Sequence, residues 1–188
     1  MTLTVGGWPH GEFEANKRDV ETHFLKLFDL VPAFAERVHA AKRESPIAGV
    51  PVANFFRKPF GEGWALVGDA GYNKDPITAQ GINDAFHDAE RCVTALDQAW
   101  GGTRSFDSAM GEYQRARDEH ALPMYEFTCQ LATMEPPPPD VQQLFGAMAG
   151  NQPAMDGFVQ MNAGTISPAQ FFSPANVGAI LGAKRPSH

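Results

Sequence analysis

The stretch that decides the fold is RKPFGEGWALVGDAGYNKDPITAQGINDAFHDA, residues Arg57–Ala89. Trp64–Val67 is a short apolar run typical of a buried strand, and it stops at Gly68-Asp69, where the chain must turn. After a polar loop, Pro76 begins a pattern of apolar residues at spacings of three and four, which predicts a long helix. The positions of this pattern are Ala79, Ile82, Ala85, Phe86, Ala89, Val93, Leu96 and Trp100. The segment therefore predicts a strand, a tight acidic turn and a long helix.

The acidic turn brings a carboxylate close to the start of this helix. Asp69 at the end of a strand is a fixed acceptor suited to a sugar hydroxyl, and a helix start offers unpaired N–H groups and a partial positive charge. Gly81 has no Cβ that would keep a ligand away from the backbone. A structural interpretation stands beside this one, because Asp75-Pro76 is itself a good N-cap and first-turn pair.

These residues resemble a known cofactor motif. Gly68-Asp69-Ala70, Pro76 and Gly81-Ile82-Asn83 are similar to the second FAD-binding motif of the group A flavoprotein monooxygenases, usually written GD-A-(x)n-P-(x)n-G-x-N. The resemblance implies that Asp69 holds the ribose of FAD, that Pro76 lies beside the flavin ring, and that the backbone of 81–83 lies near flavin N1, O2 and N3. The implied cofactor-binding set is Gly68, Asp69, Pro76, Ala79, Gln80, Gly81, Ile82 and Asn83.

The sequence departs from the family's pattern at some positions and lacks the family's N-terminal cofactor-binding motif. Many members have His where Tyr72 stands and Gly where Thr78 stands, although YQRAR at Tyr113–Arg117 is similar to the helix that follows in the family. The family's N-terminal GxGxxG, which binds the ADP half of FAD, is absent. A strand is predicted at Thr2–Val5, but the proline and glycines of residues 6–11 should prevent a helix there. The resemblance therefore implies the C-terminal portion of a longer flavoprotein.

The fold class expected from these features is α+β, as part of an α/β FAD/NAD(P)-binding fold. The chain should be helix-rich, with a small, incomplete mixed sheet. We expect a remnant of a substrate-domain sheet and a helix pair at 1–53, the FAD-contacting segment at 54–135, and a C-terminal helical tail at 136–188.

Further helices are predicted on both sides of the central stretch. Val20–Val31 keeps helical spacing with Asn16 as its cap, and Pro32 restarts the pattern. A third helical block runs from Ser105 to Met134. The shorter helices of the tail are expected at Val141–Ala149, Ala154–Asn162 and Pro174–Leu181. The tail is rich in apolar side chains that could roof a substrate pocket or simply form core: Met148, Phe158, Met161, Phe171 and Phe172.

Composition narrows the function classes. The chain has 188 residues, of which 43% are hydrophobic, so it can bury one sizeable core. Its formal charge of -7 argues against binding to nucleic acid or to an anionic membrane. No run approaches a membrane span and nothing indicates export. Cys92 and Cys129 make no disulfide framework, so we expect reduced cysteines in a cytoplasmic protein.

Chemistry carried by side chains alone has little support. The histidines are too scattered for a metal motif, and there is no GxSxG elbow or Walker loop. Asp84 and Asp88 share one helical face with His87 and Arg91 beside them, which suggests a solvated polar stripe. No residue is therefore predicted to be catalytic, and the chemistry should come from a cofactor.

The function predicted is the FAD-binding C-terminal portion of a flavin-dependent oxidoreductase. It should be monooxygenase-like and act on a small organic substrate, with NAD(P)H as a candidate electron donor. One alternative is a non-catalytic truncated or split module that needs a separate dinucleotide-binding chain, or that self-associates. Another is a flavin reductase of isoprenoid-like substrates.

Overall fold

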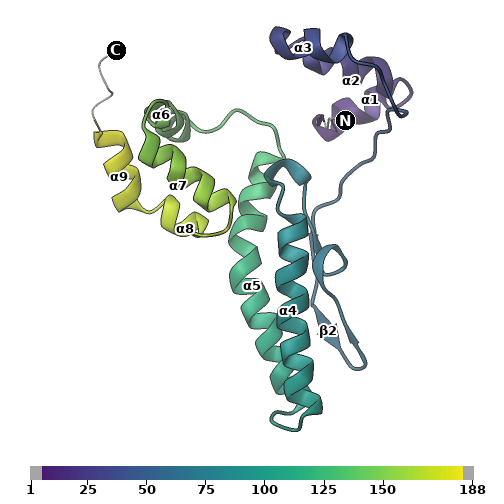
Figure 1. Cartoon of the computed structure of the whole chain (residues 1–188), viewed down its shortest axis with the longest axis vertical. Helices are drawn as coiled ribbons and strands as arrows, with labels where there is room; N and C mark the ends of the chain where they lie inside the picture. Colours follow the sequence, from purple (N-terminus) through teal and green to yellow (C-terminus); the bar gives the residue numbers. More distant parts are fainter. Residues whose placement is uncertain (1–5, 184–188) are drawn as a thin grey trace. The chain divides into compact units, whose positions relative to one another are not determined.

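A computed structural model describes residues 6–183 of the chain (Figure 1). The structure divides between Val52 and Ala53 into two compact units, which are described separately. The strand predicted at Thr2–Val5 lies outside the described residues.

The first unit is a group of short helices. They are α1 (His10–Asn16), α2 (Val20–Phe28) and α3 (Pro32–His39). The predicted helix pair is confirmed as α2 and α3, but the expectation that no helix can open near Pro9 is wrong. Pro9 occupies the N-cap of α1, a position before the helix where its fixed φ and missing N–H do no harm. The predicted cap is also wrong, because Asp19, and not Asn16, accepts a hydrogen bond from the Thr22 amide of α2.

Aromatic contacts hold this unit together. Trp8 stacks on His23 with ring centroids 5.1 Å apart, and the buried Phe28 packs against Phe24 and Phe34 at 5.0 and 5.4 Å. Residues 6–52 contain no strand in the structure.

The second unit is built on two long helices that lie side by side (Figure 1). They are α4 (Gly81–Trp100) and α5 (Phe106–Leu131), and the helix that begins at Ser105 in the prediction is confirmed with Ser105 as its N-cap. Their core consists of Cys92, Ala95, Ala109, Met110 and Tyr113, with Phe60 and Ala65 of the neighbouring strands packed against it. Cys92 is buried as predicted, and both cysteines are free.

The strands are short and precede α4. They are β1 (Phe55–Phe56), β2 (Phe60–Gly61), β3 (Trp64–Ala65) and β4 (Tyr72–Asn73). β1 pairs with β4 and β2 pairs with β3, both antiparallel, so the helix-rich α+β class is confirmed while the sheet consists of two separate pairs rather than one mixed sheet. The prediction of a buried strand at Trp64–Val67 is wrong. Only its first two residues pair in a strand, and Trp64 and Val67 are 46% and 39% exposed.

The C-terminal helices pack against the end of α5. They are α6 (Pro139–Met148), α7 (Gln152–Asn162), α8 (Pro168–Phe171) and α9 (Pro174–Gly182). Met124 of α5 joins Leu144, Met148, Met161 and Phe171 in one buried cluster. Because these methionine and phenylalanine side chains fill each other's space, they form core rather than the roof of a pocket. None of the described helices is both long enough and apolar enough to cross a membrane.

Helix α4 buries a different face from the one its apolar residues suggest. Its buried residues are Asp84, Asp88, Cys92 and Ala95. The expectation that Asp84 and Asp88 form a solvated stripe is therefore wrong. The apolar positions Ile82, Phe86, Val93 and Trp100 are instead 64–79% exposed.

Candidate cofactor site

The Gly-Asp turn is fixed by its contact with α4. Gly68 begins a short 3-10 helix, η1 (Gly68–Ala70), with a positive φ of 54° that favours glycine. A Cβ at Gly68 would lie 2.9 Å from the Cβ of Ala85, so no side chain fits between turn and helix. The Gly68 amide donates a hydrogen bond of 3.0 Å to Oδ2 of Asp88. The turn is thus held to α4 by close packing and by a buried carboxylate.

Asp69 projects from this turn without a partner. It is exposed, and its carboxylate makes no hydrogen bond or ion pair with any described residue. Its Oδ1 atom lies 3.7 Å from the point where a Cβ on Gly81 would stand, so the two motif residues are neighbours in space. The capping role that was the structural alternative belongs to Asp75, whose Oδ1 accepts from the Ile77 amide at 2.9 Å. Asp69 is therefore free to accept hydrogen bonds from a ligand.

Between the turn and α4 lies a second 3-10 helix, η2 (Pro76–Thr78), followed by a residue with unusual geometry. Ala79 has a φ of 55°, in the left-handed region that costs a non-glycine residue of order 1 kcal/mol or more. Thr78 anchors the segment, because its hydroxyl lies 2.8 Å from the Thr128 hydroxyl inside the protein. The bend at Ala79 redirects the chain so that α4 begins beside Asp69.

Gln80 points away from solvent. Its side chain is buried, and its amide nitrogen donates hydrogen bonds to the carbonyl oxygens of Thr78 and of Asn162, at the end of α7. The Gln80 side chain therefore fixes the loop to the C-terminal helices. Only the Gln80 backbone is available to a ligand.

The start of α4 is uncapped. No side chain caps the helix at Gln80, and the amides of Gly81, Ile82 and Asn83 have no acceptor among the described residues. All three residues are exposed. Because such a start carries free donors and the positive end of the helix dipole, it favours an anion. The predicted residues Gly68, Asp69 and Gly81–Asn83 are thus brought together.

Two buried acidic side chains lie beneath this surface. Lys74, which precedes η2, forms a 2.5 Å ion pair with Asp84 of α4, and both side chains are almost fully buried. Asp88, one turn further, is fully buried, and desolvation raises the pKa of its carboxyl, although the Gly68 amide and the nearby Arg117 lower it in part. These groups tie the loop to α4 from below.

Arg117 of α5 supports the strands from the other side. It is 1% exposed, donates from Nη2 to the Arg57 carbonyl at 2.9 Å and lies 4.6 Å from the centre of the Phe56 ring. Tyr72, where the family often has His, is also buried and stacks on Phe56. Burial raises the pKa of Tyr72, so its phenol stays neutral.

The prediction placed Asp84, Asp88 and Arg117 outside the site, yet a signal was present. Cys92 was expected in the core, and Asp88 and Asp84 precede it by four and eight residues. Since residues four apart share a helical face, the burial of Cys92 already implied that both carboxylates were buried.

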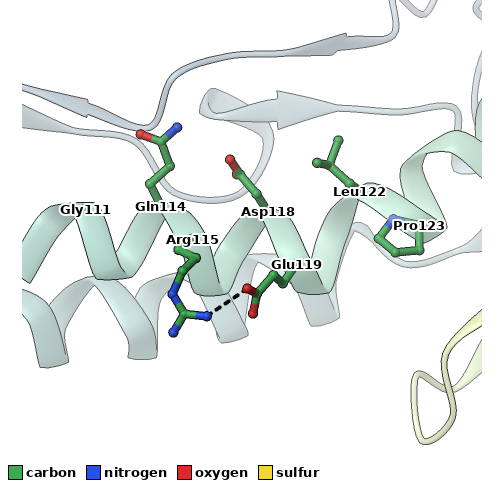
Figure 2. A pocket seen from close by; sticks show the side chains of 7 residues that line it. All are labelled: Gly111, Gln114, Arg115, Asp118, Glu119, Leu122 and Pro123. Carbon is green, nitrogen blue, oxygen red and sulfur yellow. Dashed lines mark hydrogen bonds and ion pairs between the residues drawn. The ribbon is translucent and has the colours of Figure 1, made fainter.

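A surface depression elsewhere on the second unit is separate from these residues. It is lined by seven residues that all belong to α5, and Figure 2 shows the Arg115–Glu119 ion pair of 2.8 Å at its edge. It includes no predicted site residue, and one helix alone cannot enclose a ligand.

The surface at Asp69 and α4 suits FAD. An unpaired carboxylate matches a sugar hydroxyl, free amides match the pyrophosphate or an electron-rich ring edge, and Gly81 leaves room at the backbone. No group of three potential metal ligands occurs among residues 6–183. Comparison with models of known families, with curated proteins and with solved structures gives no match to this chain.

Proposed function

We propose that this chain is the FAD-contacting portion of a flavin-dependent oxidoreductase, monooxygenase-like and acting on a small organic substrate. The observation that carries the proposal is the unpartnered carboxylate of Asp69 beside the uncapped first turn of α4. An unpaired carboxylate and unpaired helix amides do not stabilise an exposed turn by themselves. A nucleotide can use both, because its hydroxyls donate to the carboxylate and its anionic groups accept from the amides.

The residues divide into those that would hold FAD and those that position them. Asp69 would accept from a ribose hydroxyl, and the amides of Gly81–Asn83 would donate to the anionic part of the cofactor. Asp88, Thr78 and Gln80 hold the two loops in place from inside the protein.

Bound FAD would supply the redox chemistry, with NAD(P)H as the candidate electron donor. The dipole of α4 would favour negative charge at its start. No described side chain is assigned as a nucleophile or as a general base.

The test is FAD binding to the purified chain, measured by calorimetry or by quenching of flavin fluorescence. We expect a dissociation constant weaker than about 1 μM, or about -8.2 kcal/mol, because the site offers ribose, pyrophosphate and ring-edge contacts but none to adenine. Asp69→Ala should weaken binding roughly 10- to 150-fold, the equivalent of the 1.5–3 kcal/mol of a hydrogen bond to a charged group.

A matched control is Asp107→Ala, which removes an exposed carboxylate from the first turn of α5. It should leave FAD affinity unchanged. Equal FAD affinity in wild type, Asp69→Ala and Asp107→Ala would remove Asp69 from the site, and the absence of any FAD binding at millimolar cofactor would refute the proposal for this chain.

A further inference from the structure

Six apolar residues of α4, four of them exposed, follow the repeat of a coiled coil. Their spacings alternate between 4 and 3 residues, so equivalent positions recur every seven residues, as in a seam that meets another helix. This α4 seam consists of Ile82, Phe86, Ala89, Val93, Leu96 and Trp100. In heptad terms Phe86, Val93 and Trp100 are the a positions, and the other three are the d positions.

The rest of the second unit leaves four of these side chains largely uncovered, whereas Ala89 is half-buried and Leu96 packs against the unit's own core. Ile82 and Trp100 are each 79% exposed, Phe86 is 73% and Val93 is 64% exposed. The helix packs against α5 through another face, that of Cys92 and its buried neighbours. An apolar stripe on a helix normally faces other protein rather than solvent.

The two flanks of the seam differ in charge. The e positions are Asn83, Glu90 and Asp97, all exposed. Glu90 and Asp97 form no ion pair with any described residue. The g positions are Ala85, Cys92 and Ala99, which carry no charge at neutral pH and lie on the side of the unit's own core. The seam therefore has one acidic border, and charges at these positions set the choice of partner helix.

This border repels a second copy of the chain in an antiparallel pair and gives it no ion pair in a parallel one, where the e positions face the uncharged g positions. In an antiparallel pair of α4 helices the e positions of one would face the e positions of the other, so Glu90 and Asp97 would meet like charges. Each chain also carries a net charge of -7, which adds repulsion at longer range. Lysine or arginine at the facing positions would instead form ion pairs with both residues.

We propose that the α4 seam docks an amphipathic helix of a partner protein, with apolar residues at its a and d positions and basic residues on the flank that meets Glu90 and Asp97. Phe86 and Trp100 are the anchors, since large aromatic side chains supply most of the binding energy of such contacts. Each of them offers of order 150 Å² of surface. A stable interface buries about 800 Å² on each side. The seam is therefore the centre of the interface, and the residues around it supply the rest of the buried area. This inference does not depend on the flavin proposal.

The test uses a synthetic helical peptide of three heptads with isoleucine and leucine in the seam and lysine at e and g. A matched peptide has glutamate at e and g. Binding to the full chain is measured by fluorescence anisotropy at about 0.15 M salt. The lysine peptide should bind about tenfold or more tightly than the glutamate peptide. Exchange of both Glu90 and Asp97 to lysine should reverse that preference.

A pair of variants separates the seam from general charge attraction. Phe86→Asp places a charge in the seam and should weaken binding of the lysine peptide about tenfold or more. Thr94→Asp adds the same charge at an exposed position outside the seam and should leave that binding intact or stronger. Circular dichroism checks that both variants are folded.

Three results of the peptide experiments would overturn the proposal. They are no binding of the lysine peptide, equal binding of the two peptides, and equal effects of Phe86→Asp and Thr94→Asp. Sedimentation is the remaining measurement: a monomer of the free chain supports a separate partner. Self-association that Phe86→Asp abolishes would instead identify a second copy as the occupant and refute the partner helix.

Discussion

Replacement of Asp88 by alanine tests whether a buried carboxylate holds the Gly-Asp turn in place. Asp88 is fully buried, and its Oδ2 atom accepts the only hydrogen bond that the structure gives to the Gly68 amide among the described residues. Without the Asp88 carboxylate, the Gly68 amide loses its acceptor, although Gly68 remains packed against Ala85. The turn that carries Asp69 should then loosen.

The magnitude follows from two opposing contributions. Loss of a hydrogen bond to a charged group costs about 1.5–3 kcal/mol. Against this, burial raises the pKa of Asp88 and leaves its Oδ1 atom without a partner, so part of the loss is recovered when the charge is removed. We expect a net decrease of about 2 kcal/mol in the free energy of unfolding, or roughly 4–8 °C in melting temperature for a chain of this size.

The assay is thermal and urea unfolding followed by circular dichroism, with two comparison variants. Asp97→Ala removes an exposed carboxylate from the same helix and should change stability by less than about 0.5 kcal/mol. Asp88→Asn keeps an acceptor for the Gly68 amide and should cost less than Asp88→Ala.

The pH dependence of stability is a second measurement on Asp88. Because the pKa of Asp88 is higher in the folded chain than its ordinary value, the folded state holds the proton longer, and wild-type stability relative to Asp88→Asn should fall as pH rises through that folded pKa. Equal stability of Asp88→Ala and Asp97→Ala would show that the buried carboxylate does not hold the turn.

Two further predictions concern the contacts around the site. Asp84→Ala leaves the Lys74 ammonium buried without its partner and should cost about 3–5 kcal/mol, whereas the double change Lys74→Met with Asp84→Leu should cost much less, as urea unfolding of the wild type and both variants would show. Burial, together with Arg91 and His87, lowers the pKa of His120. Below its unfolded value of about 6.5 the unfolded chain takes up a proton that the folded chain resists, so stability should be lost as pH falls through this range. His120→Gln should flatten melting curves recorded from pH 7.5 to 5, and an unchanged pH profile would contradict the assignment.

The sequence by itself determined the helices and the candidate turn. Spacings of three and four residues predicted α4 and α5, because local backbone preferences act over only a few residues. The expected start of the first of these helices at Pro76 is wrong, since Asp75 and Pro76 begin the separate 3-10 helix η2 and α4 begins at Gly81. The neighbouring positions of Asp69 and Gly81 followed from the order of turn, loop and helix. That FAD binds there stays a prediction.

Only the tertiary structure decided which faces are buried. Periodicity shows that α4 has an apolar face and a polar face, but burial depends on what each face meets: Asp88 is covered by the turn at Gly68, while Phe86 has nothing over it in the second unit. The same holds for Gln80, whose side chain turns inward because a carbonyl of α7, 82 residues away in the chain, accepts its hydrogen bond. Contacts between segments so far apart leave no periodic trace in the sequence, because they depend on how whole elements pack together.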